Sequence, residues 1–275
     1  MDHDLNDILN DRSSGSAHIL KRCIQYFVWL LQNGETKVEV LLESLKRIRK
    51  NFPGFAILMH FIDYFENRLY DGLSGEKLAK SLLEYRETWN NSHQKIAASL
   101  TGMMQLNKSK VLLHSNSATI HDLFRFLVAH HYQVEVFQTL SAPNNEGLKQ
   151  AKKVSGAGFR VTLMTEASIG LIFNELDMIV LGADIIHKQG FINKTGSLAI
   201  ALMAQYFKKP LYVVADSRKI WQQQYGTMPS FNNLQDPYEI ASIENEGIHI
   251  LNYYFEEVPG KLVTGYVFEQ SGITI

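Results

Sequence analysis

Three short polar segments after residue 110 of the 275-residue chain carry side chains that could bind or transform a small polar molecule. Asp184 follows two small residues that would leave its carboxylate open to a crevice, where it could act as a general base or bind a hydroxyl group. Lys194 stands in the segment Asn193-Lys194-Thr195-Gly196, just before a helical pattern, and a lysine beside the N–H groups of a helix N-terminus attracts anions. Ser115 and Asn116 also precede a helical pattern, so the same anion-binding geometry applies to them.

Each of these segments has an ordinary structural alternative. An aspartate such as Asp184 often caps a turn or a helix. Thr195 could start the helix that follows it, with the neighbouring lysine solvated, and Asn116 or Ser117 could cap the earlier helix. The spacing of these residues leaves both interpretations open, because a helix cap and a phosphate site can use the same residues.

Several other kinds of site find no support in the sequence. Ser115 and His114 are neighbours on an extended segment, where successive side chains point opposite ways, so they do not form a catalytic pair. The serine-hydrolase motif G-x-S-x-G is absent, and no G-x-G-x-x-G follows the first expected strand. The histidines are scattered, and the single cysteine, Cys23, cannot form an internal disulfide or a thiolate zinc site. We therefore expect no metal and no cofactor.

The three segments follow short β-rich runs that alternate with helical patterns. The expected strands cover residues 111–113, 134–137, 160–164, 178–181 and 211–215. The expected helices cover residues 118–130, 147–155, 168–174 and 197–207. Buried apolar strands separated by helices predict an α/β fold with a parallel sheet covered by helices on both faces. Ligands of such sheets bind beyond the carboxyl ends of the strands, so the functional residues should directly follow each run.

The first part of the chain has helical patterns only. Apolar residues recur at three- to four-residue spacing over residues 14–33, 36–49, 55–69 and 74–99. These patterns predict a helical domain over residues 1–105, followed by the α/β domain over residues 106–275.

Charge and hydropathy restrict the partners of the protein. Lys and Arg number 27 and Asp and Glu number 28, and this balance argues against direct binding to nucleic acid or to an anionic membrane. The apolar runs are far shorter than the ~20 residues that span a bilayer, and the acidic N-terminus lacks the features of a secretory signal. We expect a cytoplasmic protein.

Taken in order, the polar segments and their flanking strands resemble one family. The matching residues are Leu113-His114-Ser115-Asn116-Ser117, 143–147, Gly182-Ala183-Asp184, Asn193-Lys194-Thr195-Gly196, 212–215 and 267–272. The family contains the alpha, beta and delta subunits of translation initiation factor 2B, together with the methylthioribose-1-phosphate and ribose-1,5-bisphosphate isomerases. The resemblance implies a helical N-terminal domain and a Rossmann-like C-terminal domain, through which members usually form dimers.

The resemblance also implies roles for individual residues. In the isomerases a cysteine after the first strand and an aspartate in a Gly-Ala-Asp motif carry the chemistry, and Ser115 and Asp184 stand at these positions. The Asn-Lys pair of the family contacts substrate, and an N-terminal Gly-Ala turn helps to hold phosphate. We therefore expect Asp184 and Ser115 at the catalytic positions. The expected ligand-binding residues are Asn116, Asn193, Lys194, Gly15, Ser16 and Gly147.

Three departures from the isomerase pattern bear on activity. Ser115 replaces the cysteine, and a serine exchanges protons near neutral pH only with a strong base close by. Ala142 and Ser14 stand where the isomerases have arginines near the substrate phosphate. Each lost charge-assisted contact is worth roughly 1.5–3 kcal/mol. We therefore expect the standard isomerisation to be impaired or absent.

Three functions are consistent with this pattern. The leading hypothesis is an initiation factor 2B-like protein that keeps a pocket for a sugar phosphate or a nucleotide-type ligand. The first alternative is an aldose–ketose isomerase acting on a phosphorylated pentose, with Asp184 as the base and Ser115 as a hydrogen-bond donor. The second is a non-catalytic regulatory or assembly subunit. A homodimer formed through the C-terminal domain is expected under each of them.

Overall fold

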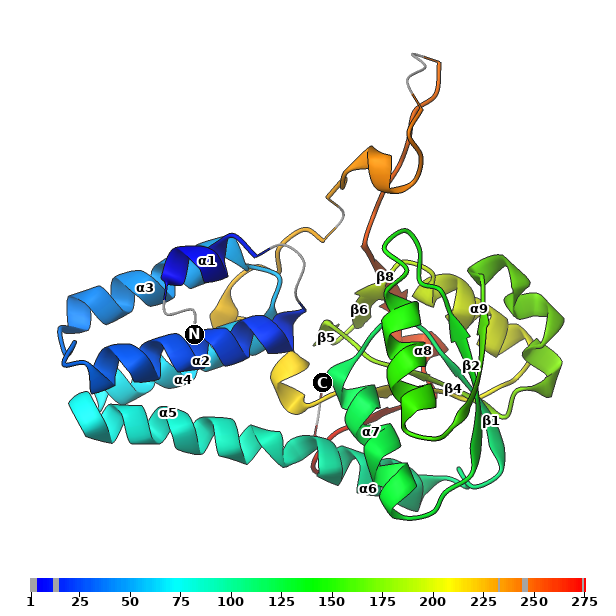
Figure 1. Ribbon diagram of the computed structural model, residues 1–275, viewed down its shortest axis with the longest axis horizontal. Coiled ribbons are helices and arrows are strands. Elements are labelled where there is room, and N and C mark those ends of the chain that lie inside the picture. Colours follow the sequence, from blue (N-terminus) through cyan, green and yellow to red (C-terminus); the bar gives the residue numbers. More distant parts are fainter. Residues whose placement is uncertain (1–3, 12–14, 232, 244–246, 274) are drawn as a thin grey trace. The chain divides into compact units, whose positions relative to one another are not determined.

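The computed structural model describes residues 4–11, 15–231, 233–243, 247–273 and 275, which form two compact units (Figure 1). The helical unit consists of residues 1–92 and 218–229, and the sheet unit consists of residues 93–217 and 230–275. Ser14, one of the positions where the isomerases have an arginine, lies outside the described residues. The domain boundary that the sequence places at residue 105 stays a prediction.

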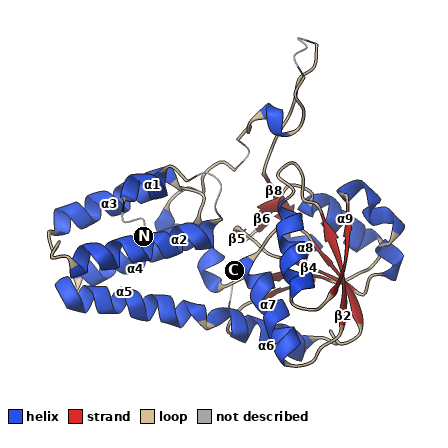
Figure 2. Ribbon diagram, in the orientation of Figure 1, coloured by secondary structure: helices blue, strands red, loops and turns tan. Residues whose placement is uncertain are grey.

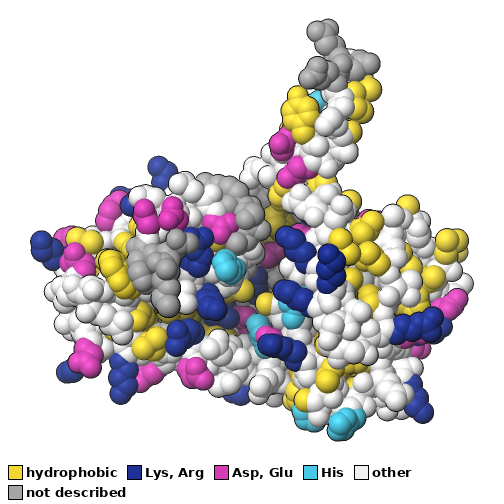
Figure 3. Space-filling view, in the orientation of Figure 1, with side chains coloured by type: hydrophobic (Ala, Val, Ile, Leu, Met, Phe, Trp, Pro, Cys, Tyr) yellow, Lys and Arg dark blue, Asp and Glu magenta, His cyan; other side chains and the backbone are white. Residues whose placement is uncertain are grey.

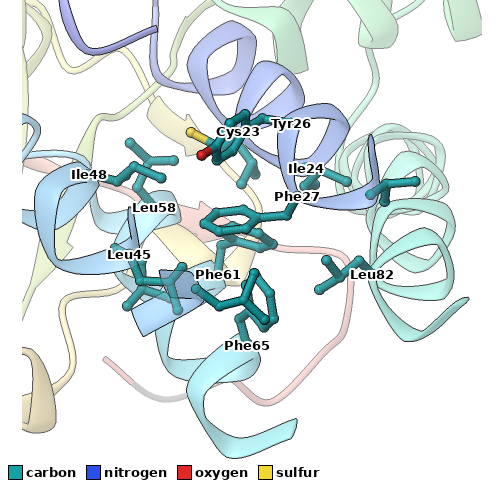
Figure 4. Packing of buried hydrophobic residues seen from close by; sticks show 14 of the residues in the cluster. Cys23, Ile24, Tyr26, Phe27, Leu45, Ile48, Leu58, Phe61, Phe65 and Leu82 are labelled. Atoms are coloured by element: carbon teal, nitrogen blue, oxygen red, sulfur yellow. The ribbon is translucent and has the colours of Figure 1, made fainter. Parts of the chain in front are cut away.

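The helical unit is built from amphipathic helices around a core of aliphatic and aromatic side chains. Its helices are α1 (Leu5–Leu9), α2 (Ser16–Gln32), α3 (Val38–Asn51), α4 (Ala56–Tyr70) and α5 (Gly75–Asn90). Phe27 of α2 is fully buried, and its ring lies 4.7 Å from that of Phe65 and 6.2 Å from that of Phe61, both on α4 (Figure 4). Cys23 is buried one turn away on α2. The helical spacing of these residues explains why the sequence predicts α2, α3 and α4 correctly.

A segment from late in the chain completes this core. Trp221 and Tyr225 pack against the buried side chains of the helical unit. The guanidinium of Arg218 lies 4.4 Å from the centre of the Trp89 ring, and Lys219 donates a hydrogen bond of 2.9 Å to Ser16. Residues 218–229 are therefore a structural part of the helical unit.

The main sheet of the other unit has six parallel strands in the order β3-β2-β1-β4-β7-β9. The strands are β1 (Ser109–Leu113), β2 (Val134–Thr139), β3 (Arg160–Met164), β4 (Met178–Leu181), β7 (Leu211–Val214) and β9 (Gly265–Val267). The five strands expected from the sequence correspond to β1, β2, β3, β4 and β7. The expected α/β class with a Rossmann-like sheet is thereby confirmed.

Helices cover both faces of this sheet. They are α6 (Ser92–Met103), α7 (Ala118–Ala129), α8 (Glu146–Gly156) and α9 (Ser197–Tyr206). Figure 2 shows α7 and α8 on one side of the strands and α9 on the other. Ile96 and Leu100 of α6 belong to the core of the sheet, together with Phe124 of α7 and Val154 of α8. The strands β1, β2, β4 and β7 are mostly buried, which is why they read as apolar runs, whereas the edge strand β3 is partly exposed.

A second, smaller sheet lies beside the functional region and was missed by the sequence patterns. Its strands are β5 (Ile185–His187), β6 (Gly190–Lys194) and β8 (Phe255–Pro259), paired antiparallel in the order β5-β6-β8. The sequence patterns predict no strand over residues 190–194, whereas the structure forms β6 there, with Asn193 and Lys194 buried at its end. A polar residue inside a buried strand is the reverse of the usual pattern.

Two expected helices also differ from the structure. The single helix expected over residues 74–99 is two helices, α5 and α6, because the chain turns at Asn91 while the apolar pattern continues on both sides. The helix expected over residues 168–174 is a pair of 3₁₀ turns, Glu166–Leu171 and Phe173–Glu175. Tight 3₁₀ turns and one short α-helix share nearly the same spacing of apolar residues.

Candidate functional site

The candidate site lies at the carboxyl ends of β1 and β4, which are neighbours in the main sheet. The chain leaves β1 toward α7 and β2 on one side of β1, whereas β4 and β7 continue on its other side. The order of the strands therefore reverses at this point, where open parallel sheets bind their ligands. Ser115 follows β1 and Asp184 follows β4, as the sequence predicts.

Ser115 is held in an unusual backbone conformation against a carboxylate. Its φ angle is +66°, in the left-handed region that a non-glycine residue seldom adopts. Its N–H donates a hydrogen bond of 2.7 Å to the hydroxyl oxygen of Ser141. Its own hydroxyl donates to Oε1 of Glu146, the first residue of α8. A carboxylate therefore orients the Ser115 hydroxyl.

Lys194, the last residue of β6, carries a cation into the same place. Its side chain is only 2 % exposed, and its Nζ lies 4.0 Å from Oε2 of Glu146. The same ammonium lies 4.6 Å from the centre of the Tyr254 ring, and the Tyr254 hydroxyl donates to Glu239. Glu146 thus connects the Ser115 hydroxyl with the Lys194 ammonium through its two oxygens.

The charged groups around Lys194 include Asp184, the second predicted catalytic residue. Burial lowers the pKa of Lys194 below its ordinary value, because it disfavours the charged ammonium. The negative charges of Glu146, Glu239, Glu166 and Asp184 act in the opposite direction. Asp184 therefore lies within electrostatic range of Lys194. A bound phosphate would add negative charge beside this partly desolvated cation and favour its protonated form.

His114 links the strand end to the turn before α9. Its Nε2 lies 3.0 Å from the carbonyl oxygen of Thr195, which can only accept, so this nitrogen carries the proton. Nδ1 then accepts a hydrogen bond of 2.6 Å from the hydroxyl of Thr139. Burial lowers the pKa of His114, so its imidazole is neutral. A Cβ on Gly196 would approach the His114 ring to 2.9 Å, which explains the glycine there.

A second carboxylate, Glu166, fixes the turn after β2. It accepts a hydrogen bond of 2.5 Å from the N–H of Ser141 and lies 3.9 Å from Nδ1 of His114. Ser141 in turn orients Ser115 through the bond described above. The turns after β1, β2 and β3 are therefore joined in one polar network around Ser115.

The structure gives the predicted ligand-binding residues different surroundings. Asn193 is buried, and its amide donates a hydrogen bond of 2.9 Å to the hydroxyl of Ser197. Gly147 is buried against β2, and its N–H donates to the carbonyl oxygen of Leu140 at 3.0 Å. Asn116 is exposed beside Ser115. Of these predicted residues, Lys194 belongs to the network around Ser115. Asn193 precedes Lys194 in the chain and bonds to Ser197 instead.

Gly15 and Ser16 belong to the helical unit, where Gly15 precedes α2 and Ser16 is its first residue. Ser16 is buried and accepts the hydrogen bond from Lys219. Their predicted part in phosphate binding stays a prediction.

Three residues of the network escape the sequence patterns. Glu146 and Glu166 follow β2 and β3 in the chain, so the rule about strand ends could have singled out both. Tyr254 precedes β8 and meets Lys194 because β6 and β8 pair across about 60 residues of chain. No local signal indicates such a pairing. Within the described residues, no group of three or more His, Cys, Asp or Glu could hold a metal ion.

Chemically, the site offers a buried cation for an anionic group and carboxylates that could accept protons. The Ser115 hydroxyl donates to Glu146, so its oxygen can accept a hydrogen bond from a ligand hydroxyl. A sugar phosphate has both kinds of group. The cation, hydroxyl and carboxylates of this site therefore match the chemistry of such a ligand.

Comparison with known proteins agrees with this fold. The model of the initiation factor 2 subunit family matches residues 13–274. An eIF-2B subunit 2-like protein of Pyrococcus furiosus is 26 % identical over 96 % of this chain and 93 % of its own length. The ribose 1,5-bisphosphate isomerase of Methanocaldococcus jannaschii is 28 % identical over 72 % of this chain and 66 % of its own length.

Solved structures share the fold. The eIF-2B structure from Pyrococcus horikoshii matches with a TM-score of 0.77 at 22 % identity, over 96 % of this chain and 93 % of that one. A subunit of the tetrameric eIF2B-beta2-delta2 complex from Chaetomium thermophilum matches with a TM-score of 0.71 at 15 % identity, over 96 % and 87 %. With the family model covering nearly all of the sequence, the chain belongs to the initiation factor 2 subunit family.

Proposed function

We propose that the protein binds a small phosphorylated ligand, a sugar phosphate or a nucleotide-type molecule, at the end of the main sheet between Ser115 and Lys194. The observation that carries the proposal is the buried Lys194 ammonium, which shares Glu146 with the Ser115 hydroxyl. A lysine is seldom buried unless its charge meets a partner. Here one carboxylate is shared with Ser115, and a phosphate would supply further negative charge. The ribose 1,5-bisphosphate isomerase among the relatives supports the choice of ligand class.

Calorimetric titration with ribose-1-phosphate, ribose-1,5-bisphosphate and AMP tests the proposal. We expect saturable binding of at least one ligand by the wild-type chain. Replacing Lys194 by methionine removes a charge-assisted contact worth roughly 1.5–3 kcal/mol, so affinity should fall by about tenfold or more. Lys188→Met changes an exposed lysine near β6 and should bind like the wild type. Absence of binding at millimolar ligand, or equal binding by the Lys194 variant, would refute the proposal.

A second candidate function is an aldose–ketose isomerase acting on a phosphorylated pentose. The contact between Ser115 and Glu146 favours it, because Glu146 fixes the position of the Ser115 hydroxyl beside the Lys194 ammonium. Asp184 would move the proton between the two neighbouring carbons, and Ser115 would donate a hydrogen bond to the substrate oxygen. Ketose formation by the wild type, lost in Asp184→Asn and kept in the exposed control Asp71→Asn, is the expected result. If wild type and Asp184→Asn are equally silent, this candidate is wrong.

A third candidate is a non-catalytic assembly subunit that pairs with a second copy through the sheet unit. It is supported by an arm with many exposed apolar side chains, formed by the described residues 230, 231, 233–243 and 247–254. They are Leu234, Tyr238, Ile240, Ile243, Ile248 and Leu251, each 44–60 % exposed. Such a concentration of exposed apolar residues is typical of an interface. The tetrameric complex among the structural relatives also favours association.

Light scattering during size-exclusion chromatography tests the homodimer. The wild type should have twice the mass of one chain, and Leu234→Glu combined with Leu251→Glu should have the mass of a monomer. Tyr70→Glu, on the exposed surface of the helical unit, is the matched control. A monomeric wild type, or a dimer unaffected by the arm substitutions, would contradict this assignment.

The described residues contain no helix that is long and apolar enough to cross a membrane. We place the function in the cytoplasm, without direct contact to nucleic acid, in line with the balanced charge of the chain. Fractionation of cells that produce the tagged full-length protein tests this location, and recovery in the membrane fraction would contradict it.

A further inference from the structure

Access to the Lys194 ammonium is restricted by an aromatic side chain. The Lys194 side chain is only 2 % exposed, and its Nζ lies 4.6 Å from the centre of the Tyr254 ring. Tyr254 itself is half-buried, so it contacts the ammonium while part of its own surface faces solvent. On this side of the site, the Tyr254 ring therefore separates Lys194 from the surrounding water.

The backbone that carries this ring is fixed to the end of β6. The N–H of Thr195 donates a hydrogen bond of 2.9 Å to the carbonyl oxygen of Tyr254. The hydroxyl of Thr195 donates one of 2.8 Å to the carbonyl oxygen of Tyr253. The next residue, Phe255, begins β8 and pairs with Lys194. Uncovering Lys194 thus requires rotation of the Tyr254 side chain rather than movement of the main chain.

The hydroxyl of the same ring is held by the arm. It donates to Oε1 of Glu239, whose Oε2 accepts a hydrogen bond of 2.9 Å from Nδ2 of Asn252. Asn252 is 1 % exposed and also donates, at 2.7 Å, to the carbonyl oxygen of Asp236. Glu239 is therefore held by a buried amide that connects the two ends of the arm. Figure 3 shows acidic side chains beside hydrophobic ones on this arm.

The Tyr254 hydroxyl keeps its proton at neutral pH. Burial raises the pKa of Tyr254, Glu239 acts in the same direction, and Asn144 acts in the opposite one. The phenol therefore remains a donor, and its hydrogen bond to a carboxylate is stronger than one between two neutral groups. An open position of the ring that lacks this bond is populated about tenfold less, or rarer still.

We infer that Tyr254 is a lid over Lys194 and that Glu239 is the latch that holds the lid closed. Rotation of the ring exposes the ammonium to a small anion, and the hydrogen bond to Glu239 closes the site again. Glu239 acts through Tyr254 and is therefore a positioning residue. The nature of the anion rests on the function proposed above, whereas the covering of Lys194 does not.

Acetylation of lysines by N-acetoxysuccinimide, followed by peptide mass spectrometry of the full-length chain, tests the lid without any ligand. In the wild type, Lys194 should react slowly and the exposed Lys188 rapidly. Tyr254→Phe keeps the ring but removes its hydroxyl, and Glu239→Ala removes the acceptor, so each should raise the rate at Lys194 about tenfold. Tyr238→Phe changes an exposed tyrosine of the same arm and should react like the wild type.

The unfolding temperature of each variant distinguishes local opening from loss of the fold. Tyr254→Phe should unfold at the wild-type temperature while its Lys194 reacts faster. Equal rates at Lys194 in the wild type and both latch variants would overturn the inference. So would a wild-type Lys194 that reacts as fast as Lys188, or a rate increase found only in variants that unfold at a lower temperature.

Stopped-flow association of ribose-1-phosphate, followed by protein fluorescence, separates the lid from the proposed ligand. Tyr254→Phe should bind about tenfold faster than the wild type, because its open position is more populated. An unchanged association rate would count against the lid while leaving the ligand in place. Faster acetylation of Lys194 in the latch variants, without any binding of ribose-1-phosphate, would support the lid and remove this ligand.

Discussion

His93 near the start of α6 should make the stability of the sheet unit depend on pH in the alkaline range. Its Nδ1 lies 2.6 Å from Asp122 of α7, and its Nε2 lies 3.7 Å from Asp216, which follows β7. The side chain is only 16 % exposed, so solvent screens these pairs weakly. Burial alone would lower the pKa of His93, yet the two aspartates raise it from 6.5 to about 9.

The size of the effect follows from that difference. Each pKa unit corresponds to about 1.4 kcal/mol, so the charged His93 contributes about 3 kcal/mol to the free energy of unfolding. Because the folded-state pKa lies above the ordinary value, this contribution is complete below pH 6.5 and disappears as the pH rises through about 9. The pKa of Asp122 is lowered, so its own contribution is lost at acid pH instead.

The assay compares wild type, His93→Gln and the exposed control His249→Gln by urea unfolding at about pH 6 and about pH 10. Wild type and control should lose about 3 kcal/mol more than His93→Gln between the two pH values. NMR titration of the His93 ring should give a pKa near 9. A ring that titrates at its ordinary value, or equal losses in all three proteins, would refute the reasoning.

Three further predictions concern packing. Gly147→Ala would place a Cβ 2.0 Å from the carbonyl oxygen of Thr139, so it should lower the free energy of unfolding by about 1–3 kcal/mol in a denaturant titration, and an unchanged midpoint would contradict the close contact. Phe27→Ala should cost about 3–5 kcal/mol, measured by thermal unfolding against the exposed control Tyr70→Ala, and equal losses in both would show that Phe27 is not a core residue. Burial raises the pKa of Cys23 to about 12, so a thiol reagent at mildly alkaline pH should label it only after unfolding, and rapid labelling of the folded chain would show that the thiol is accessible.

Much of the main sheet could be predicted from the sequence because its inner strands are buried on both faces. The runs in β1 and β4 consist almost entirely of buried aliphatic residues, and a continuous apolar run of that length has few alternatives. β9 was not expected, because it is only three residues long and contains a glycine and a tyrosine. The small antiparallel sheet was not expected either, since Asn193 and Lys194 are polar residues in a buried strand.

The candidate site was predictable to the extent that it follows strand ends. The structure brings two of the predicted site residues, Ser115 and Lys194, into one polar network, and Asp184 lies within electrostatic range of Lys194. Glu146 was not assigned a role in the sequence analysis. Its contact with Ser115 depends on where α8 begins. Asn145, just before α8, has a φ angle of +50°, which no sequence pattern indicates. Tyr254 reaches Lys194 through pairing between distant strands, which single-sequence patterns do not reveal.

The contribution of residues 218–229 to the helical unit has a consequence for how the protein is made. Trp221 and Tyr225 pack on side chains that come from the first 92 residues. The two segments of the helical unit are therefore synthesised at different times, with most of the sheet unit translated between them. The nascent N-terminal helices must therefore wait on the ribosome with part of their apolar surface uncovered until position 229 has emerged. A messenger truncated after the codon for residue 105 would yield helices that lack this cover, and such a fragment would be an obvious substrate for chaperones and proteases.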